Sequence, residues 1–506
     1  MTNKRLLLCF VLSLFTLNIS LAQENDYELL FPKDDESFTT KGEYTEGKRS
    51  GTWSVYNSDS SYFHTGTYRD GKRNGLWLVY INKLERARLF YEADTIAGPY
   101  ILFHPNGALS VRANFAGNQL EGEWKSYTRD KALLDNGNFE NGLKTGEWIS
   151  YFINGNKAVV SQYKNGELDG PYSALDEYGT KTIDAFYTKG LLNGSWKKYD
   201  YDGFVIEEGM FINGLRDGKW EYFFMPKKMS AVEFYNNGNK TGKWESFHFN
   251  GRIASEITYI DDKPVGEATS WYPNRKIESK SFYRLGLMDS IFVQYYENGA
   301  KMMEGDYNLG LKTGPWKLYH ENGMINQFGA FNIDKRTGNW KFFNDSGTLI
   351  SEGNYKLDQE VGQWFVYYFN GKLESIGSYV NGEKDGLWGY FHVSGTPMKE
   401  ETWVKGKLME ISSFTTDKGK VIETGDLKAG NGVVTNFYAD GNSFSSGNYE
   451  NGYPTGTWTF FDTKGRKVTE GELVQGVRTG VWKVFSRQGR VIKIEVYENG
   501  ELIEEL

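Results

Sequence analysis

Histidine is the side chain best suited to metal binding or proton transfer near neutral pH, and this chain of 506 residues contains five. His104, His248, His320 and His392 occupy one position of a repeated phrase, at multiples of 24 residues, and His64 lies elsewhere. Two strands advance about 9.6 Å in a sheet, so these imidazoles are too far apart to share a metal ion or a Ser/His/acid set. We therefore expect sheet residues, with no catalytic residue, no metal site, no cofactor and no enzyme activity.

Aromatic side chains are the second group with binding potential, because they stack on sugar rings and anchor protein interfaces. They make up 16% of the chain, and Tyr or Phe recurs five residues after a repeated glycine. We take this row as the candidate binding face, although packing across a single-layer sheet would explain the same row. Its members are Tyr127, Tyr151, Phe223, Tyr319 and Tyr367.

The repeated phrase defines the elements that position these residues. It reads FENGLKTGEW at 139–148 and FINGLRDGKW at 211–220. We number each unit from the glycine of Gly-x-Trp as position 0. Thirteen of the fifteen tryptophans then lie at position +2, and the spacing is 24 residues nearly everywhere. The nineteen position 0 residues are Gly51, Gly75, Gly98, Gly122, Gly146, Gly170, Gly194, Gly218, Gly242, Gly266, Ser290, Gly314, Gly338, Gly362, Gly386, Glu410, Gly432, Gly456 and Gly480.

Each unit contains two strand-like runs, with Asn-Gly or Asp-Gly at +8/+9 in eight of the nineteen units, which predicts a two-residue type I′ hairpin turn there. Tryptophan then faces a small residue at +15, and position 0 faces an aromatic residue at +17. We expect this aromatic ring to cover the bare backbone of the position 0 glycine. The repeat core predicted in this way includes Gly122, Trp124, Gly137, Phe139, Gly146, Trp148, Ser161, Tyr163, Gly314, Trp316, Gly329 and Phe331.

The fold class that follows is all-β: an elongated, single-layer antiparallel meander of about nineteen hairpin repeats, twisted into a ribbon or gutter. One face is aromatic and aliphatic, and the other is polar with an aromatic stripe. Lys and Arg recur in the turn between hairpins, with acids among them, as at Lys144 and Arg216. We expect them to keep a long sheet soluble; a basic stripe for acidic glycan or lipid is the alternative.

The ends of the chain differ from the array. Residues 1–22 have a basic start, an apolar stretch and a small-x-small site, which predicts a secretory signal peptide and export to the periplasm, cell surface or medium. A leader (23–41), the array (42–500) and a tail (501–506) follow, with irregular units near 82–98, 266–292 and 404–432. A formal net charge of −8 disfavours nucleic-acid binding.

The pattern NG-x-x-x-G-x-W-x-x-Y-x-x-NG, seen here at Asn141-Gly142, Gly146, Trp148, Tyr151 and Asn154-Gly155, resembles the MORN repeat. It is most similar to the bacterial MORN-variant family, some of whose members are labelled antitoxin components. The eukaryotic form has units a residue shorter and commonly Gly-x-Gly in place of Gly-x-Trp. The resemblance implies a ribbon of β-hairpins used as a scaffold or binding surface, sometimes dimeric or lipid-associated.

We therefore expect a non-enzymatic, exported repeat scaffold that binds a protein partner, or copies of itself, at the cell envelope. The alternative is an envelope module that binds cell-wall glycan or lipid through exposed aromatic rows. Antitoxin-like binding of a partner is a minor alternative.

Overall fold

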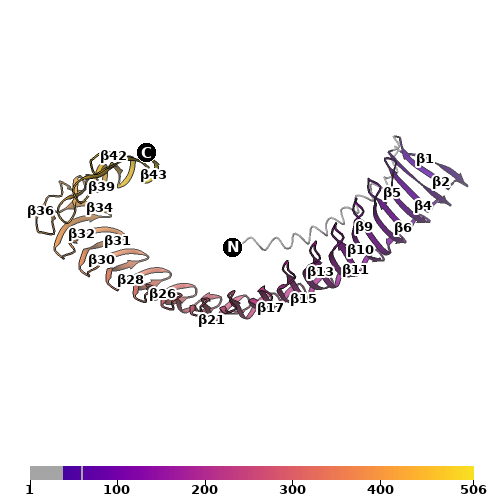
Figure 1. The fold of residues 1–506 in the computed structure, drawn as a ribbon, viewed down its shortest axis with the longest axis horizontal. Helices are drawn as coiled ribbons and strands as arrows, with labels where there is room; N and C mark the ends of the chain where they lie inside the picture. Colours follow the sequence, from indigo (N-terminus) through magenta and orange to yellow (C-terminus); the bar gives the residue numbers. More distant parts are fainter. Residues whose placement is uncertain (1–37, 59–60) are drawn as a thin grey trace. The chain divides into compact units, whose positions relative to one another are not determined.

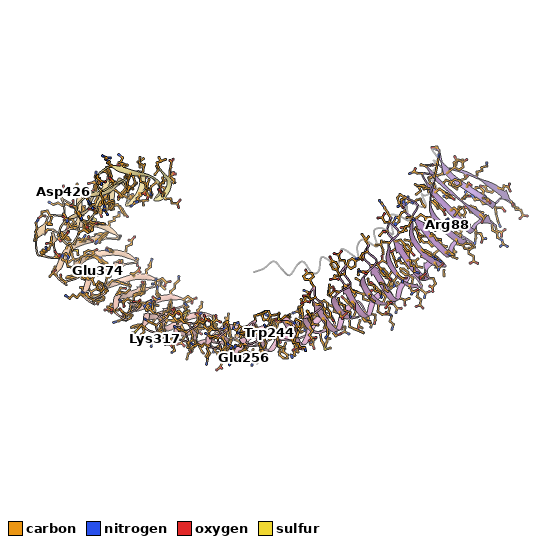
Figure 2. The ribbon with its side chains drawn as sticks, viewed as in Figure 1. Arg88, Trp244, Glu256, Lys317, Glu374 and Asp426 are labelled. Atoms are coloured by element: carbon orange, nitrogen blue, oxygen red, sulfur yellow. The ribbon has the colours of Figure 1, made fainter. Side chains whose placement is uncertain are left out.

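The computed structural model describes residues 38–58 and 61–506 (Figure 1). The predicted signal peptide (1–22) and most of the leader lie outside these residues. The chain divides into two compact units, of which the first ends at Gly242 and the second begins at Lys243. Within each unit the strands form a single layer, with side chains on both faces (Figures 1 and 2).

Strands account for nearly all of the described chain. In order they are β1(Phe38–Thr45), β2(Lys48–Asn57), β3(Tyr62–Arg69), β4(Lys72–Ile81), β5(Leu84–Glu92), β6(Thr95–Phe103), β7(Leu109–Ala116), β8(Gln119–Leu120), β9(Gly122–Tyr127), β10(Leu133–Glu140), β11(Leu143–Tyr151), β12(Lys157–Lys164), β13(Glu167–Leu175), β14(Lys181–Thr188), β15(Leu191–Tyr199), β16(Val205–Ile212), β17(Leu215–Met225), β18(Lys228–Asn236), β19(Asn239–Phe247), β20(Ile253–Ile260), β21(Lys263–Trp271) and β22(Ile277–Arg284). They continue as β23(Leu287–Met288), β24(Ser290–Tyr295), β25(Lys301–Asn308), β26(Leu311–Tyr319), β27(Ile325–Asn332), β28(Lys335–Phe343), β29(Leu349–Lys356), β30(Gln359–Tyr367), β31(Leu373–Val380), β32(Glu383–Phe391), β33(Pro397–Val404), β34(Lys407–Ile411), β35(Phe414–Thr415), β36(Val421–Ile422), β37(Gly432–Phe437), β38(Ser443–Glu450), β39(Tyr453–Phe461), β40(Lys467–Val474), β41(Val477–Phe485), β42(Val491–Glu498) and β43(Glu501–Glu505).

The predicted all-β meander is confirmed. Strands β1 to β34 form one 34-stranded sheet, β35 and β36 pair with each other, and β37 to β43 form a seven-stranded sheet. Successive strands pair antiparallel, as β11 does with β10 and β12. The first described strand begins at Phe38, inside the stretch assigned to the leader, and β43 lies in the stretch assigned to the tail. Over the described residues, no helix is long and apolar enough to cross a membrane.

The two turns of each repeat differ. The prediction of a two-residue type I′ turn at +8/+9 was wrong, because that turn type lies in the connection between hairpins. At the turn of Asn154-Gly155, the amide of Phe152 donates to the carbonyl of Asn156, so three residues form the loop. Only Gly155 has a positive φ there, at 88°. A type I turn followed by a left-handed glycine is the usual three-residue hairpin loop. We call it the wide turn.

The type I′ turn occurs in the other connection, at Asn141-Gly142. Glu140 pairs with Leu143, so only two residues lie between the strands. Both have positive φ, 50° and 78°. A type I′ turn requires this at both central positions, and Asn and Gly tolerate it best. We call it the tight turn.

The predicted cross-strand register is confirmed, but the predicted role of the position 0 glycine is wrong. Gly146 pairs with Tyr163, and Trp148 pairs with Ser161. Yet a Cβ on Gly146 would meet no atom within 4 Å. Its φ is +68°, a conformation that other residues rarely adopt. Position 0 is therefore glycine for its backbone conformation, at a bulge in the sheet.

The crowded glycine is the one at +15, and the ring that covers it comes from the following repeat. A Cβ on Gly137 would overlap the indole of Trp148, eleven residues later. The bulge at Gly146 places three residues of β11 opposite Gly137 alone. The indole nitrogen donates to the carbonyl of Asn138 at 3.1 Å. We call this arrangement the Trp/Gly contact, and it joins each repeat to its predecessor.

The same contact recurs along both units. The glycines that an indole covers in this way are Gly42, Gly66, Gly137, Gly209, Gly305, Gly329, Gly353, Gly377, Gly447 and Gly471. Where the ring at +2 is smaller, the preceding +15 residue is larger: Tyr172 follows Ser161, and Phe292 follows Ser281. The buried indole nitrogens of Trp77, which covers Gly66, and of Trp196, which follows Ala185, have no hydrogen-bond partner in the described chain. At Ser161 with Tyr172 and at Ser281 with Phe292, a larger residue at +15 is thus accompanied by a smaller ring at the following +2 position.

Acidic residues take the +15 position at Glu233, Glu401 and Glu495. Glu401 precedes the break between the two large sheets and is buried with Lys399, at 2.7 Å, and with the indole nitrogen of Trp403. Glu495, in the last complete hairpin, accepts from Tyr497 and pairs with Lys493. A charged network therefore replaces the Trp/Gly contact at these points.

Candidate binding surfaces

The tryptophan row fills the aromatic face, and ten of its thirteen members are buried, while Trp124, Trp196 and Trp244 are half-buried. Trp148 contacts Phe139 and Tyr163 edge-on, with ring centroids 5.1 and 6.1 Å away. Trp316 does the same with Tyr307 and Phe331. Each indole is thus held between +17 rings of two successive repeats, which assigns it to packing.

Cations two residues before position 0 cover this row. The Nζ atom of Lys144 lies 4.0 Å from the ring centroid of Trp148 and 5.1 Å from that of Tyr163. Burial lowers the pKa of Lys144. Arg216 lies 4.2 Å from the Trp220 ring, and Lys384 lies 4.2 Å from the Trp388 ring. These residues therefore have a packing role, through cation–π contacts, that their place in the sequence did not suggest.

The five residues of the candidate binding face are half-buried and are not gathered into one site. Tyr127 and Tyr151 lie in adjacent repeats, and Phe223 lies three repeats further on, all in the first unit. Tyr319 and Tyr367 lie two repeats apart in the second unit. Each is on the polar side of its strand, opposite the tryptophan side.

Two of these tyrosines are engaged by carboxylates of the preceding repeat. Tyr319 donates to Glu304 at 2.5 Å, and Tyr367 donates to Glu352 at 3.0 Å. Burial, together with these bonds, raises the pKa of both phenols to about 12. A hydrogen bond from Lys301, then one from Tyr319, lowers the pKa of Glu304. Their hydroxyl groups therefore hold repeats together and are not free to bind sugar.

The histidines of the repeated position form part of an inter-repeat ladder. Each donates through Nε2 to the backbone carbonyl 23 residues later, and tyrosines at the same position do so through their hydroxyl group. The pairs are His104–Tyr127, His248–Trp271, Tyr272–Tyr295, Tyr296–Tyr319, His320–Phe343, Tyr368–Phe391, His392–Thr415 and Tyr438–Phe461. The occurrence of both His and Tyr at +6 could have indicated this hydrogen bond from the sequence, because each ring carries a hydrogen-bond donor at its far end. No group of three potential metal-ligating side chains occurs in the described residues.

The wide turns carry exposed apolar side chains that the sequence reading did not single out. Adjacent wide turns are also joined, because the side-chain amide of Asn154 donates to the carbonyl of Glu177 at 2.7 Å. On this rigid edge Tyr201 is 94% exposed and Phe369 is 78% exposed. Other members of the row are Ile153, Tyr178 and Phe249.

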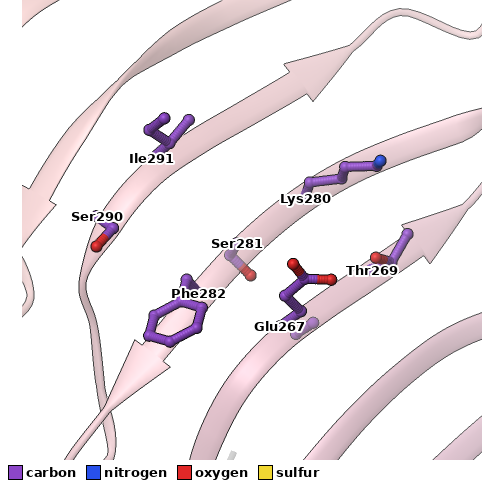
Figure 3. A pocket seen from close by; sticks show the side chains of 8 residues that line it. Glu267, Thr269, Lys280, Ser281, Phe282, Ser290 and Ile291 are labelled. Carbon is purple, nitrogen blue, oxygen red and sulfur yellow. The ribbon is translucent and has the colours of Figure 1, made fainter.

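One irregular region also contains a hollow of about 270 Å³, shown in Figure 3. It coincides with Ala268, which stands where other repeats have tryptophan, and with Ser290 at position 0. Lys280 and Glu267 line it from neighbouring strands, and neither forms an ion pair within the described chain. Other lining residues are Thr269, Ser281, Phe282 and Ile291. The hollow is open and contains no assembled acid–base pair.

An open, single-layer array of β-hairpins, in which the repeated contacts join neighbouring repeats, is typical of repeat proteins with a quasi-one-dimensional fold. The pattern of the MORN repeat variant matches residues 240–261, 336–357 and 360–381. Three segments of the chain thus match the MORN repeat variant, in agreement with the resemblance that the sequence showed. The antitoxin label of some family members stays a prediction.

Comparisons with other proteins add little. No curated protein matches the chain. Similar solved structures include the crystal structure of TcdB2-TccC3, with 11% identity over 92% of this chain and 28% of that chain, and a TM-score of 0.13. The pore of the Photorhabdus luminescens Tc holotoxin has 8% identity over 89% of this chain and 32% of that chain, also with a TM-score of 0.13. This chain thus spans less than a third of these toxin chains, and such low scores carry no conclusion.

Proposed function

We propose that this protein is a non-enzymatic scaffold of the cell envelope, which binds a protein partner or copies of itself along its edges. The observation that carries the proposal is that different side chains of each repeat make internal contacts and face solvent. Tryptophans, cations and +6 rings are used in contacts between repeats, whereas large apolar side chains at the turns stay exposed. Exposed apolar groups on a rigid support are typical of interfaces. Export by the predicted signal peptide places this scaffold outside the cytoplasm.

A pull-down with the purified chain on native envelope extract tests the scaffold function. We expect a partner to be retained by the wild-type chain and lost when Tyr178, Tyr201 and Phe369 are all replaced by Ser. The matched control replaces exposed polar residues of other wide turns, Glu297→Ser and Glu321→Ser, and should retain the partner. Absence of any specific partner, together with absence of self-association, would contradict the proposal. Cell fractionation and N-terminal sequencing test export and cleavage after Ala22.

Glycan binding is the second candidate, and one observation favours it. Tyr178 and Tyr201 lie on successive wide turns with exposed rings, an arrangement suited to stacking on sugar units. Retention on insoluble cell-wall glycan that Tyr178→Ala and Tyr201→Ala abolish would support it. Tyr151→Ala and Tyr319→Ala, in the half-buried row, should leave retention unchanged.

A further inference from the structure

The hollow of about 270 Å³ beside Ala268 lies where the repeat departs from its pattern at several positions at once (Figure 3). Ala268 stands at +2 in place of tryptophan, and Ser290 stands at position 0 of the next repeat in place of glycine. Ser290 has a φ of 63°, which is unfavourable for a residue with a side chain. Departures from a regular pattern that gather at one place point to a functional site.

The charges at two positions are also reversed in this repeat. In the preceding repeat, Lys243 at +1 forms an ion pair with Glu256 at +14, with 2.6 Å between the nitrogen and the oxygen. This repeat has Glu267 at +1 and Lys280 at +14, and both are exposed. Their side chains form no hydrogen bond or ion pair with any of the residues that the structure describes. A cation and an anion of the same face therefore stay without partners.

Side chains from three neighbouring strands surround the hollow. In the register of β21 with β22, Thr269 lies opposite Lys280. Glu267 lies opposite Phe282, two residues further along each strand. These four side chains share one face of the sheet, because opposite residues do so and residues two apart in a strand do so as well. Ile291 of β24 completes the lining from the other side of β22.

The lining offers a cation, an anion, a hydroxyl group and an apolar surface. Phe282 is 39% exposed and Ile291 is 67% exposed. Thr269 contributes the hydroxyl group, whereas the hydroxyl group of Ser290 donates to Asp289 at 3.3 Å. An ammonium group and a carboxylate that lack partners are complementary to a ligand that carries both charges.

We propose that this hollow binds a free α-amino acid with an apolar side chain. The ammonium group of the ligand donates to Glu267, and its carboxylate accepts from Lys280 and from the hydroxyl group of Thr269. Its apolar side chain packs on Phe282 and Ile291, which removes apolar surface from water. An acidic sugar would satisfy the lysine but would leave Glu267 without a cation.

The volume of the hollow also favours a ligand of this size. Pockets for drug-sized molecules begin at about 300 Å³, and this hollow lies just below that range. A single small molecule therefore fits, and a protein partner does not. The proposal goes beyond the scaffold function, which needs no small ligand.

Saturation-transfer NMR of the purified chain with L-leucine and with L-phenylalanine tests the ligand class. We expect both to bind at about millimolar concentrations, because the site is open to solvent. Three analogues each remove one feature: glycine lacks the apolar side chain, N-acetyl-L-leucine lacks the ammonium group, and L-leucinamide lacks the carboxylate. Each should bind at least about fivefold more weakly than L-leucine. Failure of both amino acids to bind, equal binding of the analogues, or tighter binding of glucuronic acid would overturn the ligand class.

Substitution of the two charged residues tests the place of binding. Glu267→Gln and Lys280→Gln should each weaken the binding of L-leucine at least about fivefold. The matched control Lys341→Gln removes a lysine that is paired with Glu352 at 2.9 Å, and it should bind L-leucine as wild type does. A loss of binding in the control as large as that in Lys280→Gln would overturn the site.

Exchange of the two charges separates loss of the site from loss of fold. The double variant Glu267→Lys/Lys280→Glu copies the arrangement of Lys243 and Glu256 in the preceding repeat. We expect it to form the same ion pair, to lose L-leucine binding, and to keep the unfolding midpoint of wild type. Undiminished binding by this variant would overturn the proposal. Capture of an envelope partner is measured separately, so failure of the amino-acid site leaves the scaffold function intact.

Discussion

At the scale of single residues, the repeat contains two kinds of glycine that sequence alone does not separate. Gly329 has ordinary backbone angles and is covered by Trp340, whereas Gly338 has a φ of +65° and open space around it. Both belong to the predicted small positions of the hairpin. Only the geometry shows that one is small because of a side chain and the other because of its backbone.

These two glycines should respond differently to substitution. We expect Gly329→Ala to lower the free energy of unfolding by about 3 kcal/mol, since a methyl group cannot share space with the buried indole. Gly338→Ala should lower it by about 1 kcal/mol through backbone strain. Asn should be tolerated at 338 and not at 329, because asparagine accepts the left-handed region. Urea denaturation followed by tryptophan fluorescence measures this, and equal effects of Asn at both sites would contradict it.

The tyrosine–carboxylate bonds predict a loss of stability at high pH. The pKa of Tyr319 is raised to about 12 in the folded chain, by burial and by its bond to Glu304, from an ordinary value of 10.0. A raised pKa stabilises the fold fully below 10, and this stabilisation is lost as pH rises through 12. Tyr319→Phe should therefore reduce the dependence of the unfolding midpoint on pH between 10 and 12. Tyr201→Phe, at an exposed ring, is the control and should change nothing.

At the scale of the element, the hairpin, its length and its register could be predicted, but the contact that joins hairpins could not. Period, turn residues and alternation fix a strand pair because they act within about twenty residues. The contact between Trp148 and Gly137 depends on a bulge that places three residues opposite one, and no local pattern encodes that displacement. The exchange of volume between +2 and the preceding +15 position was present in the sequence. This relation between the two side-chain sizes can be recognised only when the structure shows that the two positions are in contact.

This exchange predicts that paired substitutions compensate. Gly137→Ser should destabilise the chain because the hydroxymethyl group meets the indole of Trp148. Trp148→Tyr should relieve part of that loss, since Ser161 and Tyr172 already occupy the same two positions in the next repeat. We expect a coupling free energy of about 1–2 kcal/mol in a double-mutant cycle. A coupling near zero would show that the two positions do not determine each other's size.

The +6 ladder makes a separate prediction about how repeats are joined. Tyr296→Phe removes a bond of 2.8 Å to the carbonyl of Tyr319 and keeps the ring. We expect a loss of about 1 kcal/mol in the free energy of unfolding, with faster amide exchange confined to the neighbouring wide turns. Uniform exchange along the chain would contradict a local role for this bond.

At the scale of the whole molecule, every stabilising contact described above lies within a repeat or between neighbours. Deletion of one entire 24-residue repeat should therefore leave the rest of the fold intact. Deletion of residues 314–337 brings Trp340 into register with Gly305, which already accepts Trp316. We expect this chain to keep its circular dichroism and its resistance to proteolysis, whereas deletion of residues 314–325 alone should lose both because the Trp/Gly contact can no longer form. Equal behaviour of the two deletions would contradict a repeat-by-repeat fold.

The Trp/Gly contact also bears on the order in which the repeats can fold as the chain is synthesised. In ten repeats the tryptophan packs on a glycine that was synthesised eleven residues earlier, so a repeat that has just emerged finds this part of its packing surface already in place. The second ring contact of the tryptophan, as from Trp148 to Tyr163, forms once the strand that completes the same hairpin has been added. The array can thus be completed in the order in which its residues leave a ribosome or an export channel, one repeat after another.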